Sequence, residues 1–192
     1  FYKIFLKRLV TFSLLILLIP INTFFKLKSK ETEFTQLIED NQGIVHKICR
    51  VYTSTQEEHE DLFQEIVLQL WKSYDSFKGD SKFSTWMYRV SLNTAITLIR
   101  KKKRNVMTSS IDSQSYFDIK ASESDKEKEE QLKVLYRAIK KLNDVERALV
   151  LLYLEDMSYK EIASTMGISE VNARVKMSRI RVKLKELMTL EE

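Results

Sequence analysis

The chain has 192 residues, of which 44% are hydrophobic and 31% are charged, so it can form one domain or two small ones. Three glycines and one proline favour helices throughout. The single cysteine, Cys49, excludes an intramolecular disulfide and, with only His46 and His59 beside it, leaves no metal or zinc set. We predict a reducing, cytoplasmic setting, with Cys49 in the core and His46 on the surface.

The net charge of +5 is modest, but the positive residues are clustered. One cluster lies at 100–104 and another in the C-terminal helix described below. Two separated basic sites favour two contacts with nucleic acid. No glycine loop for phosphate, no metal set and no nucleophile–base pair is evident, so we predict no catalytic residues, no cofactor and no small-molecule substrate.

The N-terminus contains an apolar run at 9–25 that superficially suits a signal peptide or a membrane anchor. The run is about 17 residues long, contains Pro20 and falls below the roughly 20 residues of a spanning helix. Because position 1 is Phe1 and not Met, the sequence is a fragment, a processed chain or a translation that begins upstream of the true start. We favour the last reading, in which the functional protein begins near Lys28 and 1–30 is an N-terminal extension of doubtful authenticity. The alternative is a membrane tether, if the cellular product keeps the run.

A first helical module is predicted over 31–104. Its first run has apolar residues at three- and four-residue spacing: Phe34, Leu37, Ile38, Ile44, Val45 and Ile48. The second run covers 59–74, with a predicted buried stripe of Leu62, Phe63, Ile66, Val67, Leu70 and Tyr74. Leu68 lies instead among outward-facing polar residues of this run, and a leucine in that position favours a protein partner. The alternative is an ordinary exposed leucine on a solvated surface.

The third run, 84–100, is apolar nearly all round except for one strip. The strip consists of Trp86, Arg89, Asn93, Thr97 and Arg100. An aromatic ring stacks on bases, guanidinium neutralises phosphate and an amide can bind a base edge, so the strip favours single-stranded or melted DNA. A polar loop with two aromatics and a glycine, 75–83, precedes it. The alternative is that Trp86 is core and Arg89 forms a surface ion pair.

Residues 105–130 are rich in Ser, Asp and Glu and poor in large apolar side chains, which predicts a flexible acidic linker. A second module follows over 131–188, with helices predicted over 131–141 and 145–154. Asn143 can cap the second of these helices, with Glu146 as its capping-box partner.

Residues 158–187 have the pattern of a DNA-reading helix-turn-helix. Ser158 and Glu161 form a capping box, Gly167 suits the turn, and Ser169 can cap the second helix. That helix has one apolar face, which must be core: Ala173, Met177, Ile180, Leu184 and Leu187. Its other surface is cationic and partly apolar: Val171, Asn172, Arg174, Val175, Ser178 and Arg179, flanked by Lys176, Arg181, Lys183 and Lys185. These residues suit phosphates, base edges and thymine methyl groups, although a solvated basic helix is the alternative.

Two groups of motifs resemble the extracytoplasmic-function (ECF) sigma factors, over about residues 34–187. Residues 61–65 (DLFQE) with Trp71, and 77–90 (FKGDSKFSTWMYRV) with Asn93, resemble sigma region 2. Residues 158–163 (SYKEIA), with Arg174, Lys176, Arg179 and Arg181, are similar to sigma region 4. The resemblance implies an all-α fold of two small helical domains: region 2 at 31–104, an acidic linker at 105–130 and region 4 at 131–188.

The resemblance also implies partners and sites: a dissociable subunit that binds core RNA polymerase and promoter DNA and is open to control by an anti-sigma factor. Asp61, Gln64, Glu65 and Leu68 would dock on the polymerase clamp. The melted −10 element would meet Phe77, Lys78, Gly79, Asp80, Ser81, Phe83, Trp86, Arg89, Asn93 and Arg100. The −35 duplex would meet Val171, Asn172, Arg174, Val175, Lys176, Ser178, Arg179 and Arg181.

Departures from the family pattern limit what is carried over. Asn143 stands where the family usually has proline, and Asn172 and Val175 replace the usual Thr and Ser, so the −35 sequence preference does not transfer. One alternative function is a one-component regulator that binds duplex DNA without polymerase. Another is a membrane-tethered signalling protein with a genuine apolar N-terminus.

Overall fold

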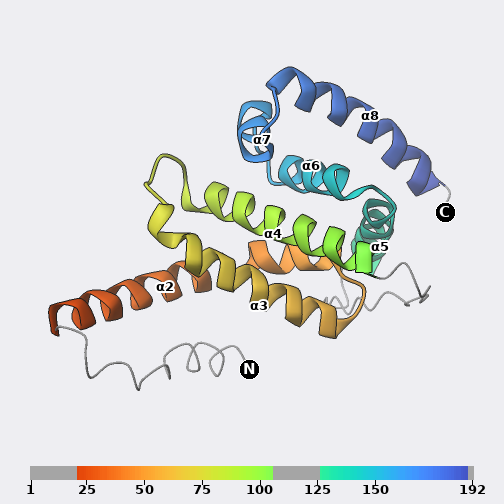
Figure 1. Cartoon of the computed structure of the whole chain (residues 1–192). Helices are drawn as coiled ribbons and strands as arrows, with labels where there is room; N and C mark the ends of the chain where they lie inside the picture. The colour runs from red at the N-terminus through yellow and green to blue at the C-terminus, as the bar shows by residue number, and fades with distance from the viewer. Residues whose placement is uncertain (1–20, 106–125, 190–192) are drawn as a thin grey trace. The chain divides into compact units, whose positions relative to one another are not determined.

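The computed structural model describes residues 21–105 and 126–189 (Figure 1). No strand occurs within these two stretches, so the predicted all-α fold is confirmed there. The first helix, α2, spans Ile21–Tyr52, and the chain divides into two compact units within it, between Asp40 and Asn41. Across the described stretches, no helix has the length and apolarity needed to cross a membrane.

The predicted N-terminal extension and acidic linker lie partly outside the described residues, which exclude 1–20 and 106–125. From Ile21 onward the N-terminal segment belongs to α2. The helix predicted over 131–141 already begins at Lys126, because α5 spans Lys126–Lys140. Lys and Glu dominate the added turn, and both are good helix formers as well as typical linker residues.

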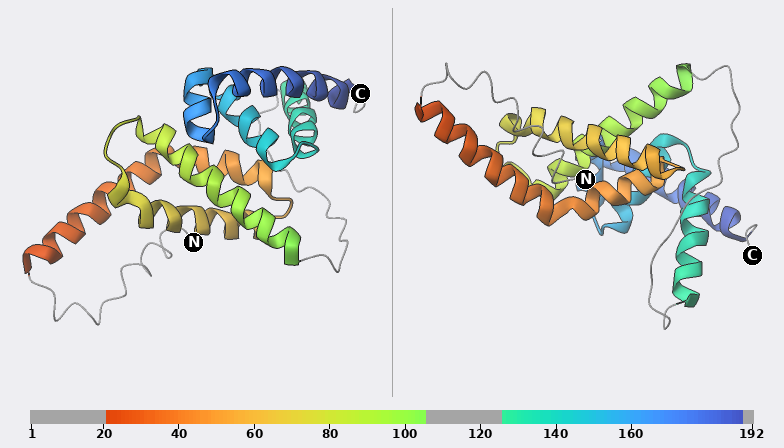
Figure 2. Two further views of the ribbon diagram at one scale, coloured as in Figure 1. Left: turned by 45° about the horizontal axis from the view of Figure 1, so that its top comes forward. Right: turned by 90° about the horizontal axis from the view of Figure 1, so that it is seen from below.

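Helices α3 (Gln56–Ser73) and α4 (Phe83–Asn105) pack side by side, and a short 3-10 helix, η2 (Tyr74–Ser76), follows α3 (Figures 1 and 2). Thr55 caps α3, because its hydroxyl accepts a bond of 3.2 Å from the Glu58 N–H. The core between the helices contains Leu62, Ile66, Val67 and Leu70 of α3 and Met87, Tyr88, Leu92, Ala95 and Ile96 of α4. Phe63 and Tyr74, also predicted in the buried stripe, are only half-buried.

Cys49 is buried as predicted, and desolvation raises the pKa of its thiol to about 12. The prediction of a surface histidine at position 46 is wrong. His46 is half-buried, lies 3.0 Å from a ring nitrogen of His59 and stacks on Phe63, with ring centroids 4.7 Å apart. The helical spacing within α2 did not indicate this pairing, because both partners come from α3.

The C-terminal helices are α5, α6 (Asp144–Leu154), α7 (Tyr159–Met166) and α8 (Glu170–Thr189). Helices α5, α6 and α7 all contact α8, which buries Ala173, Met177 and Ile180, whereas Leu184 and Leu187 are half-buried. The pair α7–α8 forms the predicted helix-turn-helix.

The capping residues predicted from the sequence form the expected hydrogen bonds. Asn143 and Glu146 make a reciprocal capping box at the start of α6, and Ser158 and Glu161 make another at the start of α7. The bonds from the Ser158 hydroxyl and N–H hold the pKa of the Glu161 carboxyl below its usual value. Gly167 ends α7 with a φ of 66°, a left-handed conformation that favours glycine.

Helix α4 also contacts α6 and α7, a packing that periodicity did not predict. Three polar bonds accompany it at the C-terminal end of α2. The Tyr52 hydroxyl donates to the Asp144 carbonyl at 2.6 Å, Lys140 Nζ donates to the Thr53 carbonyl at 2.7 Å, and Arg147 Nη1 donates to the Val51 carbonyl at 3.3 Å. Burial, reinforced by the charge of Arg147, lowers the pKa of Lys140 to about 8.

Candidate protein and nucleic-acid interfaces

The α3 face predicted to bind polymerase is accessible. Asp61 and Gln64 are exposed, whereas Glu65 and Leu68 are half-buried. Glu65 Oε1 accepts a hydrogen bond of 2.8 Å from Gln69, which fixes that carboxylate along the helix. Because Leu68 is half-buried, it is more covered than the helical wheel indicated, but part of its side chain is still accessible to a partner.

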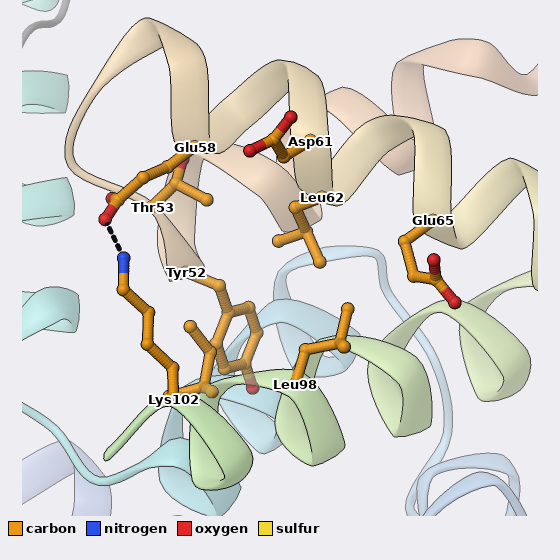
Figure 3. A pocket seen from close by; sticks show the side chains of 9 residues that line it. Tyr52, Thr53, Glu58, Asp61, Leu62, Glu65, Leu98 and Lys102 are labelled. Atoms are coloured by element: carbon orange, nitrogen blue, oxygen red, sulfur yellow. Dashed lines mark hydrogen bonds and ion pairs between the residues drawn. The ribbon is translucent and has the colours of Figure 1, made fainter. Parts of the chain in front are cut away.

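A groove of about 390 Å³ lies beside this face (Figure 3). Its lining combines carboxylates at the rim with aliphatic side chains at the floor: Tyr52, Thr53, Glu58, Asp61, Leu62, Glu65, Leu98, Ile99 and Lys102. Lys102 forms an ion pair with Glu58. The sequence did not reveal the groove, because three separate segments contribute to its wall.

The charge state of Glu58 follows from its partners. Burial opposes ionisation, but the hydrogen bonds from Lys102 and from the Ser54 N–H outweigh it and hold the pKa of Glu58 below its usual value. Asp61 and Glu65 add two further carboxyl groups to the same rim. Because Lys102 offsets the charge of Glu58, the net negative charge at the rim comes from Asp61 and Glu65, and it complements a basic, partly apolar partner.

The predicted strip on α4 faces outward. Arg89, Asn93, Thr97 and Arg100 are exposed and Trp86 is half-buried, while Met87, Tyr88 and Leu92 on the other side of the helix are buried. Helix α4 thus presents basic and amide side chains on its exposed side and packs into the core with its opposite side. Trp86 packs against Phe77 and Phe83 and keeps part of its surface open to solvent, as a residue at the edge of the core does.

Three aromatic side chains gather at the start of α4. The ring centroids of Phe77, Phe83 and Trp86 lie 5.3 to 5.5 Å from one another. Gly79, with a φ of 78°, turns the loop between the first two, and the loop side chains of Lys78, Asp80 and Ser81 are exposed. The sequence placed two aromatics near the strip but did not show that all three rings would touch.

The outward face of α8 matches its predicted composition. Val171 and Val175 are 71% and 43% exposed, and Lys176 is half-buried. Apart from Lys176, the polar residues predicted to meet DNA are exposed: Asn172, Arg174, Ser178, Arg179 and Arg181. Val182, at 59% exposure, extends the same face. It was missed although it lies seven residues after Val175, on the same side of the helix.

Two arginines of α8 are held by side chains of the preceding helices. The Arg174 guanidinium lies 4.8 Å from the Tyr159 ring centroid and donates to Glu170 Oε1 at 2.6 Å. The Arg181 guanidinium lies 4.6 Å from the Tyr153 ring centroid and donates to the Tyr159 hydroxyl at 3.1 Å. The contacts with the tyrosines could not be predicted from spacing along α8, because Tyr153 belongs to α6 and Tyr159 to α7, whereas the Glu170–Arg174 pair follows the i,i+4 spacing of one helix.

Comparison with known protein families assigns most of the described chain. Residues 37–105 match Sigma-70 region 2, and residues 132–184 match Sigma-70, region 4. The chain is 30% identical over 131 residues to the ECF RNA polymerase sigma-E factor of Escherichia coli K12, covering 63% of this chain and 69% of the relative. It is 28% identical over 158 residues to the corresponding factor of Haemophilus influenzae, covering 77% and 83%.

Two solved structures share the fold. The sigma factor RpoE of Bartonella quintana, crystallised with the anti-sigma factor NepR, gives a TM-score of 0.67 at 20% identity and covers 83% of this chain and 99% of that one. CnrH, solved with the cytosolic domain of CnrY, gives 0.59 at 21% identity, covering 83% and 89%. On the strength of the matched regions and of the sigma-E relatives, the chain belongs to the ECF family of RNA polymerase sigma factors.

Proposed function

We propose that three exposed faces divide the work of this sigma factor, which binds core RNA polymerase and directs promoter-specific initiation. The acidic face of α3 would contact the polymerase clamp. The loop before α4, together with the α4 strip, would hold the melted −10 element. Helix α8 would read the −35 element as duplex DNA.

The observation that carries this proposal is the row of Arg89, Asn93 and Arg100 on the exposed side of α4, behind the aromatic cluster of Phe77, Phe83 and Trp86. Unpairing a base costs a few kcal/mol, which stacking on aromatic rings and hydrogen bonds to the base can offset. The guanidinium groups would neutralise the phosphates of the same strand. A solvated helix face would not need three clustered aromatic rings next to its cations.

The outward face of α8 supports the duplex assignment. Asn172 and Arg174 carry the amide and guanidinium groups that bind base edges in the major groove, and Val171 and Val175 can contact thymine methyl groups. The buried side of the same helix fixes its orientation against α6 and α7.

The α3 face supports the polymerase assignment, because Asp61, Gln64, Glu65 and Leu68 combine charge with an apolar contact. The polymerase would supply the chemistry, so we assign no catalytic role to the chain and propose that it works in the cytoplasm with that enzyme. From its likeness to a sigma factor solved with an anti-sigma factor, we also propose an inhibitory protein partner.

Run-off transcription with purified core RNA polymerase tests the proposal. The full chain should bind mixed-sequence duplex weakly by itself and should direct initiation at defined sites once core enzyme is added. A one-component regulator would instead bind its operator tightly without polymerase and leave initiation by core enzyme unchanged. That result would overturn the proposal.

A further inference from the structure

The side chains of Tyr153, Tyr159 and Arg181 form a contact cluster on the flank of α8. We propose that Tyr159 is a positioning residue for Arg181: its hydroxyl, together with the Tyr153 ring, holds the guanidinium ready to bind a backbone phosphate of duplex DNA. This inference rests on the proposed function of α8, and it adds a role for a residue outside that helix.

The contacts restrain Arg181 from two sides. Its guanidinium lies 4.6 Å from the Tyr153 ring centroid, and its Nη2 donates to the Tyr159 hydroxyl at 3.1 Å. The two rings lie beside each other, with centroids 6.3 Å apart. A free arginine samples many rotamers and loses that freedom when it binds an anion. Arg181 has already lost much of it, although its side chain remains exposed at the surface.

The bond to tyrosine leaves donor capacity for DNA. A guanidinium carries five N–H donors in a planar fork, and the Tyr159 hydroxyl takes one of them. The others can meet the oxygens of a phosphate in the paired geometry that arginine favours. Tyrosine therefore fixes the direction of the fork without neutralising its charge.

Arg174 provides an internal contrast. It also lies over the Tyr159 ring, but its guanidinium is paired with the Glu170 carboxylate at 2.6 Å. A phosphate approaching Arg174 must compete with that carboxylate. The partners of Arg181 in this cluster are neutral, so a phosphate meets no anionic competitor there. Of the two arginines, Arg181 is therefore the one whose guanidinium is oriented and not paired with a carboxylate in this cluster, which suits a contact with a DNA phosphate.

The test uses the full chain and a fluorescent mixed-sequence DNA duplex, because a phosphate contact does not depend on base sequence. Affinity is measured by anisotropy over a salt series for wild type, Tyr159→Phe, Arg181→Ala and the double variant. Arg181→Ala should reduce the slope of log K against log salt by about 0.9, as expected for one lost phosphate contact. Tyr159→Phe keeps the ring beneath Arg174 and should weaken binding roughly two- to tenfold at low salt.

The decisive comparison is Tyr159→Phe in the Arg181→Ala background, where it should have no further effect. The thermal midpoint of Tyr159→Phe should match wild type, since Tyr159 is only half-buried and the ring is retained. An equal loss of affinity in both backgrounds would show that Tyr159 acts without Arg181 and would overturn the inference. Wild-type affinity of Tyr159→Phe alone would also overturn it.

Arg179→Ala separates this inference from the proposed function. Arg179 is exposed on α8, outside the tyrosine cluster. If Arg181→Ala binds duplex like wild type and Arg179→Ala binds more weakly, the inference fails and duplex reading by α8 stands. If both variants bind like wild type, the inference and the −35 assignment fail together.

Discussion

His46 Nδ1 lies 3.0 Å from His59 Nε2, a hydrogen-bond distance at which one of these two half-buried imidazoles donates its N–H to the other. The pKa of each ring lies below its ordinary value, chiefly because burial disfavours the charged form. Arg50 lowers the pKa of His46 further. At His59, His46 and then Arg50 lower the pKa, and Glu60 raises it only in part. The native chain therefore favours a pair that carries no extra proton.

This pair predicts a loss of stability in mild acid. Below about pH 6.5 the histidines bind protons more readily in the unfolded chain than in the native one. The free energy of unfolding should therefore fall as the pH drops further. The pKa values of Glu58 and Glu146 are also lowered, but these carboxyls titrate below their usual value of 4.5. Urea unfolding between about pH 7 and 5 should therefore report mainly on the histidines. In the His59→Gln variant the free energy of unfolding should change less with pH than in the wild type. An equally steep change with pH in this variant would refute the assignment to the histidine pair.

Replacing Asp61 by alanine should weaken association with core RNA polymerase by up to about fivefold, the usual range for one exposed charge. Binding to duplex DNA should not change, because the carboxylate lies on α3 and not on α8. Pull-down titration with core enzyme measures the effect. Glu60→Gln, an exposed carboxylate of α3 outside the proposed docking face, is the matched control. Equal losses for both variants would argue against a specific contact.

Asn93→Ala should reduce open-complex formation about two- to tenfold, the cost of one hydrogen bond to a base edge. Asn93 is exposed, so the fold should tolerate the change. Trp86→Ala should act in the same direction and more strongly, since it removes a stacking surface. Permanganate footprinting measures melting, and core-enzyme binding should stay at the wild-type level. A parallel loss of polymerase binding would contradict the −10 assignment.

Glu170→Gln should tighten binding to mixed-sequence duplex by about two- to fivefold, because the substitution frees Arg174 from its ion pair and removes a negative charge beside the DNA. The salt dependence should become steeper by up to about one phosphate contact. Anisotropy over a salt series provides the measurement. Unchanged affinity would mean that Arg174 makes no phosphate contact even when it is released from Glu170.

Two glycines should respond to alanine with opposite signs. Gly167→Ala should lower the free energy of unfolding by about 1–2 kcal/mol, since its φ of 66° strains any residue with a Cβ. Gly43→Ala, in the interior of α2, should raise it by about 0.5–1 kcal/mol. An added Cβ meets no atom within 4 Å at either site, so backbone conformation alone decides the sign. Urea unfolding of both variants measures these free energies. A change of the same sign in both variants would show that backbone conformation does not decide the outcome.

The features that sequence could predict are those encoded within a few residues. The boxes at Asn143 and Ser158, the turn at Gly167 and the exposed strip of α4 all depend on spacing along one segment. The features that sequence missed join separate helices. The His46–His59 pair and the groove beside α3 depend on how helices cross, which hydrophobic periodicity does not specify.

The composition of the linker led to a wrong prediction of where α5 begins. Residues 126–130 consist entirely of Lys and Glu and were predicted to belong to the acidic linker, yet they form the first turn of α5. Charged residues such as Lys and Glu suit a solvated coil and a helix end equally well. Charge content therefore could not locate the boundary.

The main-chain acceptors at the end of α2 have an evolutionary consequence. Lys140 and Arg147 donate to the carbonyl oxygens of Thr53 and Val51, and every amino acid offers such an oxygen. The bonds therefore do not depend on which side chains stand at positions 51 and 53, although both side chains are buried and their size is set by packing. On the donating side the chemistry is specific, because only a long cationic side chain at positions 140 and 147 can reach these oxygens, so homologues that keep this junction should keep Lys or Arg there.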